Sequence, residues 1–374
     1  MRTQLVVIQP TSLCNINCRY CYLPDRSVNK RIRMETLSQI FKRLFSSPFV
    51  SDDLTIVWHV GEPLMLPPSF YEEAFQIMQQ WNTQGVLVTH SFQTNGTCIT
   101  QQWCDFFKKH HVQIGVSIDG PKAIHDANRV DWAGKGTFDR VLRGITLLRE
   151  NQLPFSIIAV VTRNSVYQPD DFWQFFKELD PVRLGLNPEE ADGANKESSL
   201  QTDEDIAAYQ RFFARILELA AQERGLSLIR ESESLLASVK SGSLLSRSQT
   251  SVPMAIISFD RDGNISTFSP ELLTMTHVSY GDFIFGNVFQ DTLEDILMKP
   301  KFMEVNREIQ QGVLQCLQSC PYFMFCGGGN PSNKLSENGT FNSTETRACR
   351  LRVKTATDAM IERLEKQYEI LPTL

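Results

Sequence analysis

Short apolar runs alternate with amphipathic stretches along the first half of the chain. Aliphatic and β-branched residues gather in six runs, at residues 5–9, 54–59, 86–93, 112–118, 155–161 and 182–186. Between these runs apolar residues recur every three or four positions, as at Leu37, Ile40, Phe41 and Leu44, which is the spacing of a helix with one buried face. Six strands alternating with five helices predict successive βα units and a parallel sheet, either open and doubly wound or closed into a partial barrel.

The pattern changes after the sixth predicted strand. A long amphipathic stretch predicts a helix over 203–224, with Thr202 or Asp203 as its N-cap and Gly225 as its stop. Residues 232–250, rich in serine with pairs of leucines, are typical of a connector between domains. We expect a main domain over 1–225. Residues 226–300 are expected to form a connector and the start of a second, small domain, and residues 301–374 to form that small domain with a C-terminal helix.

Polar and glycine residues follow most of the predicted strands. Because parallel strands end at one edge of a sheet, where α/β folds have their active sites, we expect these residues to lie together. They are the cysteine-containing run 14–21 after the first strand, Gly61-Glu62-Pro63 after the second, Gln93-Thr94-Asn95-Gly96 after the third, Ser117 to Gly120 after the fourth, and Asn187-Pro188-Glu189-Glu190 after the sixth.

Composition restricts the class of protein. The 374 residues are 42% hydrophobic and 21% charged, which is typical of a globular enzyme, and the net charge of −6 argues against a nucleic-acid partner held by phosphate contacts. No apolar run is long enough to cross a membrane, and the chain enters its first strand without a visible signal peptide. Nine cysteines without such a signal predict a cytoplasmic protein that binds metal through thiols.

Three cysteines lie within eight residues, Cys14, Cys18 and Cys21. This spacing lets one loop place three thiolates on three irons of a cubane cluster, whereas clusters that only transfer electrons normally take four cysteines. The fourth iron is then open to a ligand. The alternative is a zinc knuckle, which needs a fourth ligand nearby, and the closest histidine is His59.

The run from Cys14 to Cys21 resembles the CxxxCxxC signature of radical S-adenosylmethionine (SAM) enzymes, with an aromatic residue, Tyr20, before the last cysteine. The resemblance implies a partial (β/α)6 TIM-like barrel and a [4Fe–4S] cluster whose open iron chelates SAM. An electron from the cluster would cleave SAM to a 5′-deoxyadenosyl radical. It also implies that Gly61 and Glu62 bind the amino group of SAM, although Val60 stands where the family has a first glycine.

Further SAM contacts are implied for residues that follow the third and fourth strands. Ser117 and Asp119 match family positions at the ribose or methionine end of SAM, and Asn95 matches a turn near it. Arg129 is placed to pair with the SAM carboxylate. Asn95 is equally typical of an Asn-Gly turn, and Arg129 of a surface ion pair.

A second set of cysteines closes the chain: Cys316, Cys320, Cys326 and Cys349. Four thiolates fit a fully ligated cluster or a zinc site, and their spacing does not choose between the two. The set resembles the SPASM domain of peptide-modifying radical SAM enzymes, which implies an auxiliary [4Fe–4S] cluster. A complete SPASM domain holds two clusters, but no cysteine lies between residues 190 and 315. We therefore expect one auxiliary cluster.

Residues 259–272 and 326–341 resemble the GrrM/Xye-type subset, maturases of ribosomally made peptides, several of which form three-residue cyclophanes. This resemblance implies an oxidative crosslink between an aromatic ring carbon and a β-carbon of a precursor peptide, with an external electron donor. Loss of the last proton needs a base. We expect Glu190 and Glu271 to be catalytic, among the candidates Glu189, Glu190, Asp192, Glu271 and Glu337.

Two other functions stay open. One is oxidation of a Cys or Ser side chain, as in anaerobic sulfatase-maturing enzymes, which the run 117–129 suits equally well. The other is a zinc-binding module without turnover. Cys104, among Trp103, Phe106 and Phe107, is expected to be a buried apolar thiol, and Cys98 is expected to have no ligand role.

Overall fold

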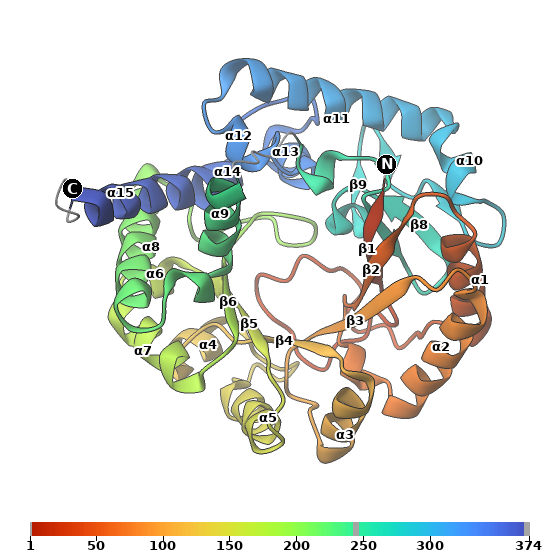
Figure 1. Ribbon diagram of the computed structural model, residues 1–374, viewed down its shortest axis with the longest axis horizontal. Helices are drawn as coiled ribbons and strands as arrows, with labels where there is room; N and C mark the ends of the chain where they lie inside the picture. The colour runs from red at the N-terminus through yellow and green to blue at the C-terminus, as the bar shows by residue number, and fades with distance from the viewer. Residues whose placement is uncertain (1, 242–246, 370–374) are drawn as a thin grey trace.

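The computed structural model describes residues 2–241 and 247–369, and its centre is one curved sheet of nine strands. Its first six strands are parallel and follow one another in order. They are β1 (Thr3–Ile8), β2 (Val50–Trp58), β3 (Leu87–Thr94), β4 (Gln113–Ser117), β5 (Ser156–Val161) and β6 (Arg183–Pro188). The predicted α/β fold with a parallel sheet is confirmed, and the strands form an open arc in Figure 1.

Helices cover the outside of this arc (Figure 1). They are α1 (Met34–Phe45), α2 (Pro68–Trp81), α3 (Gln101–His110), α4 (Lys122–Asn128), α5 (Phe138–Glu150), α6 (Arg163–Val166), α7 (Pro169–Leu179) and α8 (Asp203–Glu223). Alternate strand residues such as Ile56, Trp58 and Phe92 point outward and are fully buried against the helices. Buried Cys104 on α3 belongs to this core, as predicted. The inward residues of the strands are left to form the site.

Helix α8 begins as the sequence predicts. The Thr202 hydroxyl accepts a hydrogen bond from the Asp205 N–H, and the Asp205 carboxylate accepts one from the Thr202 N–H, which is a capping box. Asp205 also receives a two-point contact from Arg163, which anchors the helix to α6. Gly225 follows the helix with a φ of +90°, a conformation that favours glycine and ends the helical path.

The sheet continues beyond the sixth predicted strand. β7 (Ile256–Phe259) pairs in parallel with β1, β8 (Asn264–Thr267) pairs antiparallel with β7, and β11 (Gly286–Asn287) follows β8. β1 is therefore an interior strand. These strands lie in the part predicted over 226–300, for which no strand was expected, although Ile256 to Phe259 followed by Asp262-Gly263 is the pattern of a strand and a tight turn.

The rest of the chain forms a layer of helices beside β7 and β8 and a return to the barrel (Figure 1). Its elements are α9 (Arg230–Ser241), β9 (Thr276–His277), β10 (Gly281–Asp282), α10 (Leu293–Leu297), α11 (Pro300–Ser319), α12 (Phe323–Cys326), α13 (Pro331–Asn338), α14 (Arg347–Cys349) and α15 (Thr355–Glu369). α15 packs along α8. Of the predicted connector, residues up to 241 lie in α9, and residues 242–246 lie outside the described residues. The domain boundaries stay predictions.

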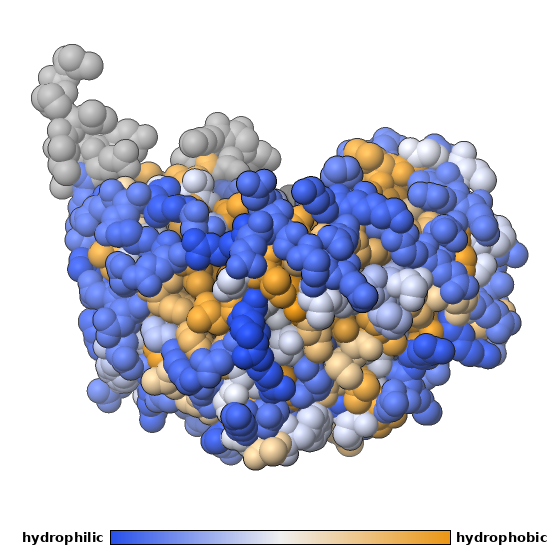
Figure 2. Space-filling view, turned by 90° about the horizontal axis from the view of Figure 1, so that it is seen from below, coloured by the Kyte–Doolittle hydropathy of each residue, from blue (hydrophilic) through white to orange (hydrophobic). Residues whose placement is uncertain are grey.

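The outer surface is mainly hydrophilic. Figure 2 shows charged and polar side chains over most of one face, with hydrophobic ones in recesses between them. Over residues 2–241 and 247–369, no helix combines the length and apolar character that a membrane span requires.

Candidate active site

The first three cysteines lie in the long loop between β1 and α1, at the carboxyl end of β1. Contacts from distant segments fix the backbone of this loop. The Cys14 N–H donates to the Arg26 carbonyl at 2.9 Å, and the Cys14 carbonyl accepts from the Trp132 indole N–H at 2.9 Å. The Arg26 guanidinium donates to the Cys18 carbonyl at 2.8 Å. The positions of the cysteines are thus set before any ligand binds.

The thiols are shielded from water, and each of two has a donor beside it. Burial, followed by the charge of Glu62, raises the pKa of Cys14 to about 12, and burial raises that of Cys18 to about 11. The Asn95 amide lies 3.7 Å from the Cys14 sulfur, and the Arg129 guanidinium lies 3.8 Å from the Cys18 sulfur. Three thiols on one loop, two of them with a donor beside the sulfur, fit a centre that is bound through thiolates.

Glu62 is buried at the carboxyl end of β2, where it is only 1% exposed. One carboxylate oxygen accepts from the Leu64 N–H at 2.9 Å and from the Thr94 hydroxyl at 2.7 Å, and the other accepts from the Asn95 N–H at 2.7 Å. Burial nevertheless raises its pKa to about 7. No cation among the described residues pairs with it, so a ligand ammonium would complete its environment.

The two residues that directly precede Glu62, Val60 and Gly61, both have left-handed backbone conformations. Gly61 has a φ of +72°, and a Cβ there would lie 2.4 Å from the Thr11 carbonyl oxygen, so only glycine fits. Val60, which replaces a family glycine, has a φ of +74°. A β-branched residue is strained in this conformation. Val60 is buried against Val7, Leu23 and Ile256, which offsets that strain with packing.

Asn95 connects Glu62 to the cysteine loop. Its side-chain amide donates to Asn15 Oδ1 at 2.9 Å, and its Oδ1 accepts from the Thr97 N–H at 2.9 Å. Asn95 therefore does more than form a turn, because its side-chain amide also contacts the Cys14 sulfur. Ser117 lies at the end of β4 and accepts a hydrogen bond from the Gln93 amide at 2.9 Å.

Asp119 and Arg129 form a buried ion pair. Arg129 Nε donates to Asp119 Oδ1 at 3.0 Å, and that oxygen also accepts from the Val160 N–H at 3.0 Å. The Tyr20 hydroxyl donates to the other oxygen of Asp119, and the Tyr20 ring lies beneath the guanidinium. Arg129 is thus neither on the surface nor without a partner. The pair joins the signature aromatic residue to the Cys18 thiol.

His59, named from the sequence only as the histidine closest to the first three cysteines, lies at the edge of the site. It follows β2 directly, one residue before Val60, and its Nδ1 is buried with no partner among the described residues. Burial lowers its pKa to about 4, so the ring is neutral at pH 7 and can accept or donate one hydrogen bond. The sequence could have pointed to His59 as a residue of the site, because it stands between the end of a strand and Gly61-Glu62.

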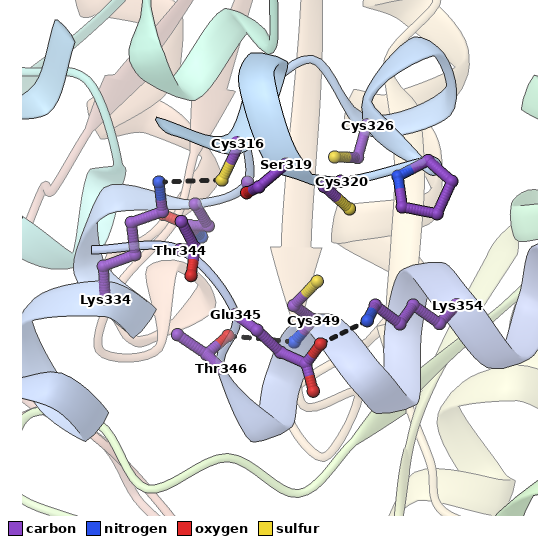
Figure 3. A pocket seen from close by; sticks show the side chains of 13 residues that line it. Cys316, Ser319, Cys320, Cys326, Lys334, Thr344, Glu345, Thr346, Cys349 and Lys354 are labelled. Atoms are coloured by element: carbon purple, nitrogen blue, oxygen red, sulfur yellow. Dashed lines mark hydrogen bonds and ion pairs between the residues drawn. The ribbon is translucent and has the colours of Figure 1, made fainter. Parts of the chain in front are cut away.

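The second set of cysteines surrounds a cavity of about 110 Å³. Cys316 comes from α11, Cys320 directly follows it, Cys326 ends α12 and Cys349 ends α14. Figure 3 shows the four side chains around one space, with Lys334 joined to Cys316. The N–H groups of Gly328 and Gly329 act on Cys326 and oppose the rise in its pKa that burial causes. Thiols with such donors fit an anionic, thiolate-bound centre.

The geometry bears on which centre this is. In the part of the chain that the structure describes, no three His, Cys, Asp or Glu side chains are arranged to hold a single metal ion. A zinc ion needs four ligands within about 2.3 Å of one point. The four thiols around the cavity of about 110 Å³ fit a centre bound through thiolates.

Three carboxyl groups lie between the two sets of cysteines. Burial, followed by the charge of Asp192, raises the pKa of Glu271 to about 7, and burial raises that of Asp192 to about 6. Glu271 Oε2 is buried and has no hydrogen-bond partner among the described residues. Glu190 accepts from Asn333 at 2.9 Å and from Arg352 at 3.1 Å. Tyr22, beside Cys21, lies within the field of Glu271 and Asp192.

The other two candidate bases hold backbone in place. The Glu189 carboxylate accepts from the N–H of Ser199 at 2.8 Å and also from its hydroxyl. Glu337 accepts from the N–H of Ala348 at 3.0 Å and from that of Arg347, and so fixes the turn that carries Cys349. These contacts explain both residues without catalysis.

Comparison with known proteins identifies the family. Residues 8–179 match the Radical SAM superfamily. This part of the chain is a radical SAM domain. Radical SAM enzymes use a [4Fe–4S] cluster and SAM, so the predicted enzyme class and cofactors are confirmed.

Relatives extend over nearly the whole radical SAM chain. It is 41% identical over 368 residues to the uncharacterized protein sll1766 of Synechocystis sp., covering 97% of this chain and 92% of the relative. It is 26% identical over 352 residues to the serine-type anaerobic sulfatase-maturating enzyme of Bacteroides thetaiotaomicron, covering 88% and 83%. The solved structure of native anSMEcpe with bound AdoMet and Cp18Cys peptide superimposes with a TM-score of 0.78 at 22% identity, covering 98% and 100%, which shows a shared fold.

Proposed function

We propose that this radical SAM enzyme oxidises a ribosomally made precursor peptide by joining an aromatic ring carbon to a β-carbon, with loss of two hydrogen atoms. The observation that carries the proposal is helix α13, which connects the carboxyl groups at the barrel edge to the second thiol set. Asn333 binds Glu190, Ser336 binds Asp192 at 2.9 Å, and Lys334 reaches Cys316. A proton acceptor and an electron acceptor therefore belong to one site.

The first thiol set and the residues around it fit the SAM-binding cluster. We assign Cys14, Cys18 and Cys21 as its ligands, with Gly61 and Glu62 at the amino group of SAM. Asn95 and the Asp119–Arg129 pair hold the cysteine loop, and Ser117 lies at the neighbouring strand end. When bound, SAM and its cluster would supply a 5′-deoxyadenosyl radical that removes a substrate hydrogen atom. A second, auxiliary cluster, held by Cys316, Cys320, Cys326 and Cys349, would supply a one-electron acceptor.

Glu271 is our assignment for the base that takes the last proton. A pKa of about 7 leaves it substantially ionised at neutral pH, while its unpartnered oxygen is free to receive a proton. Glu190 is held by Asn333 and Arg352, which suits a positioning residue rather than a proton acceptor. Asp192 lies within the field of Glu271 and helps to keep that carboxyl weakly acidic.

A cavity of about 680 Å³ lies beside this site, on the side of Cys326, and offers space for a peptide segment. It is lined by residues of α9, β7 and the C-terminal part, and it reaches Cys326, Asn333 and Arg352. Its volume lies in the range of ordinary ligand sites, about 300–1,000 Å³. An extended segment of a peptide fits such a space better than a folded protein surface does.

Oxidation of a Cys or Ser side chain is the second candidate, because the named relative from Bacteroides thetaiotaomicron is a serine-type anaerobic sulfatase-maturating enzyme. The absence of any cysteine between residues 190 and 315 favours the crosslink, since it leaves thiols for one auxiliary cluster. Both reactions need a base and a peptide, and they differ in the product.

The experiment is anaerobic reconstitution with iron and sulfide, followed by reduction with SAM and candidate peptides. We expect about eight irons per chain, 5′-deoxyadenosine, and a peptide product that has lost two hydrogen atoms. Tandem mass spectra without fragmentation inside the joined residues would support the crosslink. A product that reacts with a hydrazide carries an aldehyde and would replace the crosslink with the second candidate. Cleavage that survives the joint replacement of Cys14, Cys18 and Cys21 by alanine would refute the cluster assignment.

A further inference from the structure

Lys334 is a buried cation whose charge no carboxylate balances. Its side chain lies on α13, only 4% exposed. The ammonium donates to the Gly312 carbonyl at 3.0 Å and to the Cys316 sulfur at 3.4 Å. Across residues 2–241 and 247–369, no Asp or Glu forms an ion pair with it. A buried charge without a partner is costly, so an anion is expected beside it.

The other lysine at this cavity is different. Lys354 also lines the space between the four cysteines, but it is more exposed and is paired with Glu345 (Figure 3). Its charge is already balanced at the surface. Beside the same four thiols, Lys334 is therefore buried without an ion-pair partner among the described residues, whereas Lys354 is paired with Glu345.

The SAM-cluster loop also has a cation, but that cation is neutralised. Arg129 lies 3.8 Å from the Cys18 sulfur and 3.0 Å from Asp119 Oδ1, and both side chains are buried. The Arg26 guanidinium, which donates to the Cys18 carbonyl at 2.8 Å, adds a second positive charge near that thiol, whereas Lys334 is the buried charge next to Cys316. Electrostatic interactions at these distances are strong when water is excluded.

We propose that Lys334 raises the reduction potential of the auxiliary cluster. Reduction adds one negative charge to a thiolate-bound cluster, and a nearby ammonium stabilises the more negative form. The assignment rests on the proposed function, because it needs a cluster at Cys316, Cys320, Cys326 and Cys349. It explains why a lysine is buried there, and it makes this cluster a better electron acceptor than it would be without the charge.

The test is a redox titration of the full chain carrying Cys14, Cys18 and Cys21 replaced by alanine, so that only the auxiliary cluster contributes. In this background Lys334→Gln removes the charge but keeps a donor for the Gly312 carbonyl. We expect its midpoint potential to move to a more negative value. Lys334→Arg, which keeps the charge, should stay close to the parent. The matched control is Lys354→Gln combined with Glu345→Gln, which removes a balanced pair beside the same cavity and leaves the net charge unchanged, so little shift is expected.

The outcomes separate this inference from the function on which it rests. About four irons in the parent with an unchanged potential in Lys334→Gln would overturn the inference and leave the auxiliary cluster in place. A parent without iron would overturn the proposed function itself. Loss of the irons in both Lys334 variants would make Lys334 structural and refute tuning. Loss in Lys334→Gln alone, with the potential kept in Lys334→Arg, would support the need for its charge.

Discussion

The side-chain amide of Asn333 donates a 2.9 Å hydrogen bond to the Glu190 carboxylate. The two residues are 143 positions apart, one on α13 and one just after β6. The neighbour of Asn333, Lys334, contacts a thiol of the second set, so one short helix touches both the barrel edge and the proposed auxiliary centre. Movement of α13 would therefore change the distance between the substrate and its electron acceptor.

Replacing Asn333 with alanine should uncouple the two halves of the reaction. The variant loses a hydrogen bond to a charged group, which is worth about 1.5–3 kcal/mol, so the thermal unfolding midpoint should fall. 5′-Deoxyadenosine should still form, but less product should form for each SAM cleaved. Asn338→Ala is the matched control, since Asn338 lies on the same helix and contacts only Ser343 and Glu345. An unchanged ratio in Asn333→Ala would refute the coupling.

Replacing Glu271 with glutamine should abolish the proposed proton transfer while sparing SAM cleavage. A general base contributes roughly 10²–10⁴-fold, so the rate of product formation should fall by at least about 10²-fold. In the parent enzyme, this rate should rise with pH through about 7, because only the ionised Glu271 accepts a proton. The rate of peptide modification, measured against pH with 5′-deoxyadenosine as internal reference, checks both statements. Full activity of Glu271→Gln would assign the proton to another group.

Alanine at Gly61 should damage the SAM site more than backbone strain alone explains. Gly61 and Gly85 share a φ of +72°, but a Cβ at Gly85 meets nothing within 4 Å, whereas at Gly61 it meets the Thr11 carbonyl. We expect Gly85→Ala to cost about 1 kcal/mol of unfolding free energy and Gly61→Ala clearly more. Only Gly61→Ala should weaken SAM binding, measured by equilibrium dialysis on the reconstituted protein. Equal effects in both variants would show that the clash is relieved.

The strain at Val60 predicts an inverted order of stability. Removing the valine side chain loses packing in both Val60→Ala and Val60→Gly, but only glycine relaxes the φ of +74°. Val60→Gly should therefore be more stable than Val60→Ala by about 1 kcal/mol, opposite to the usual preference in regular structure. Thermal unfolding of the two proteins decides the order. A less stable glycine variant would mean that the backbone at Val60 is not strained.

The first six strands could be predicted because each is an apolar run bounded by turn residues, and the cysteine spacing made the family visible. β7 was missed because it is four residues long and pairs with β1, far away in sequence. The partners of Glu190 and Lys334 could not be predicted, because neither contact leaves a local pattern. The sequence predicts separate roles for Asp119 and Arg129, whereas in the structure the two side chains form one buried ion pair.

The position of β1 has a consequence for assembly of the protein. This strand lies between β2 and β7, and the Thr3 hydroxyl donates to the Met254 carbonyl, 251 residues later in the chain. Long-range pairing of this kind is slow to form, because the intervening chain must first be ordered. During synthesis, β7 is made long after β1, so β1, which precedes the loop that carries Cys14, still has one unpaired edge. Insertion of the iron cofactor is therefore expected to follow translation of most of the chain.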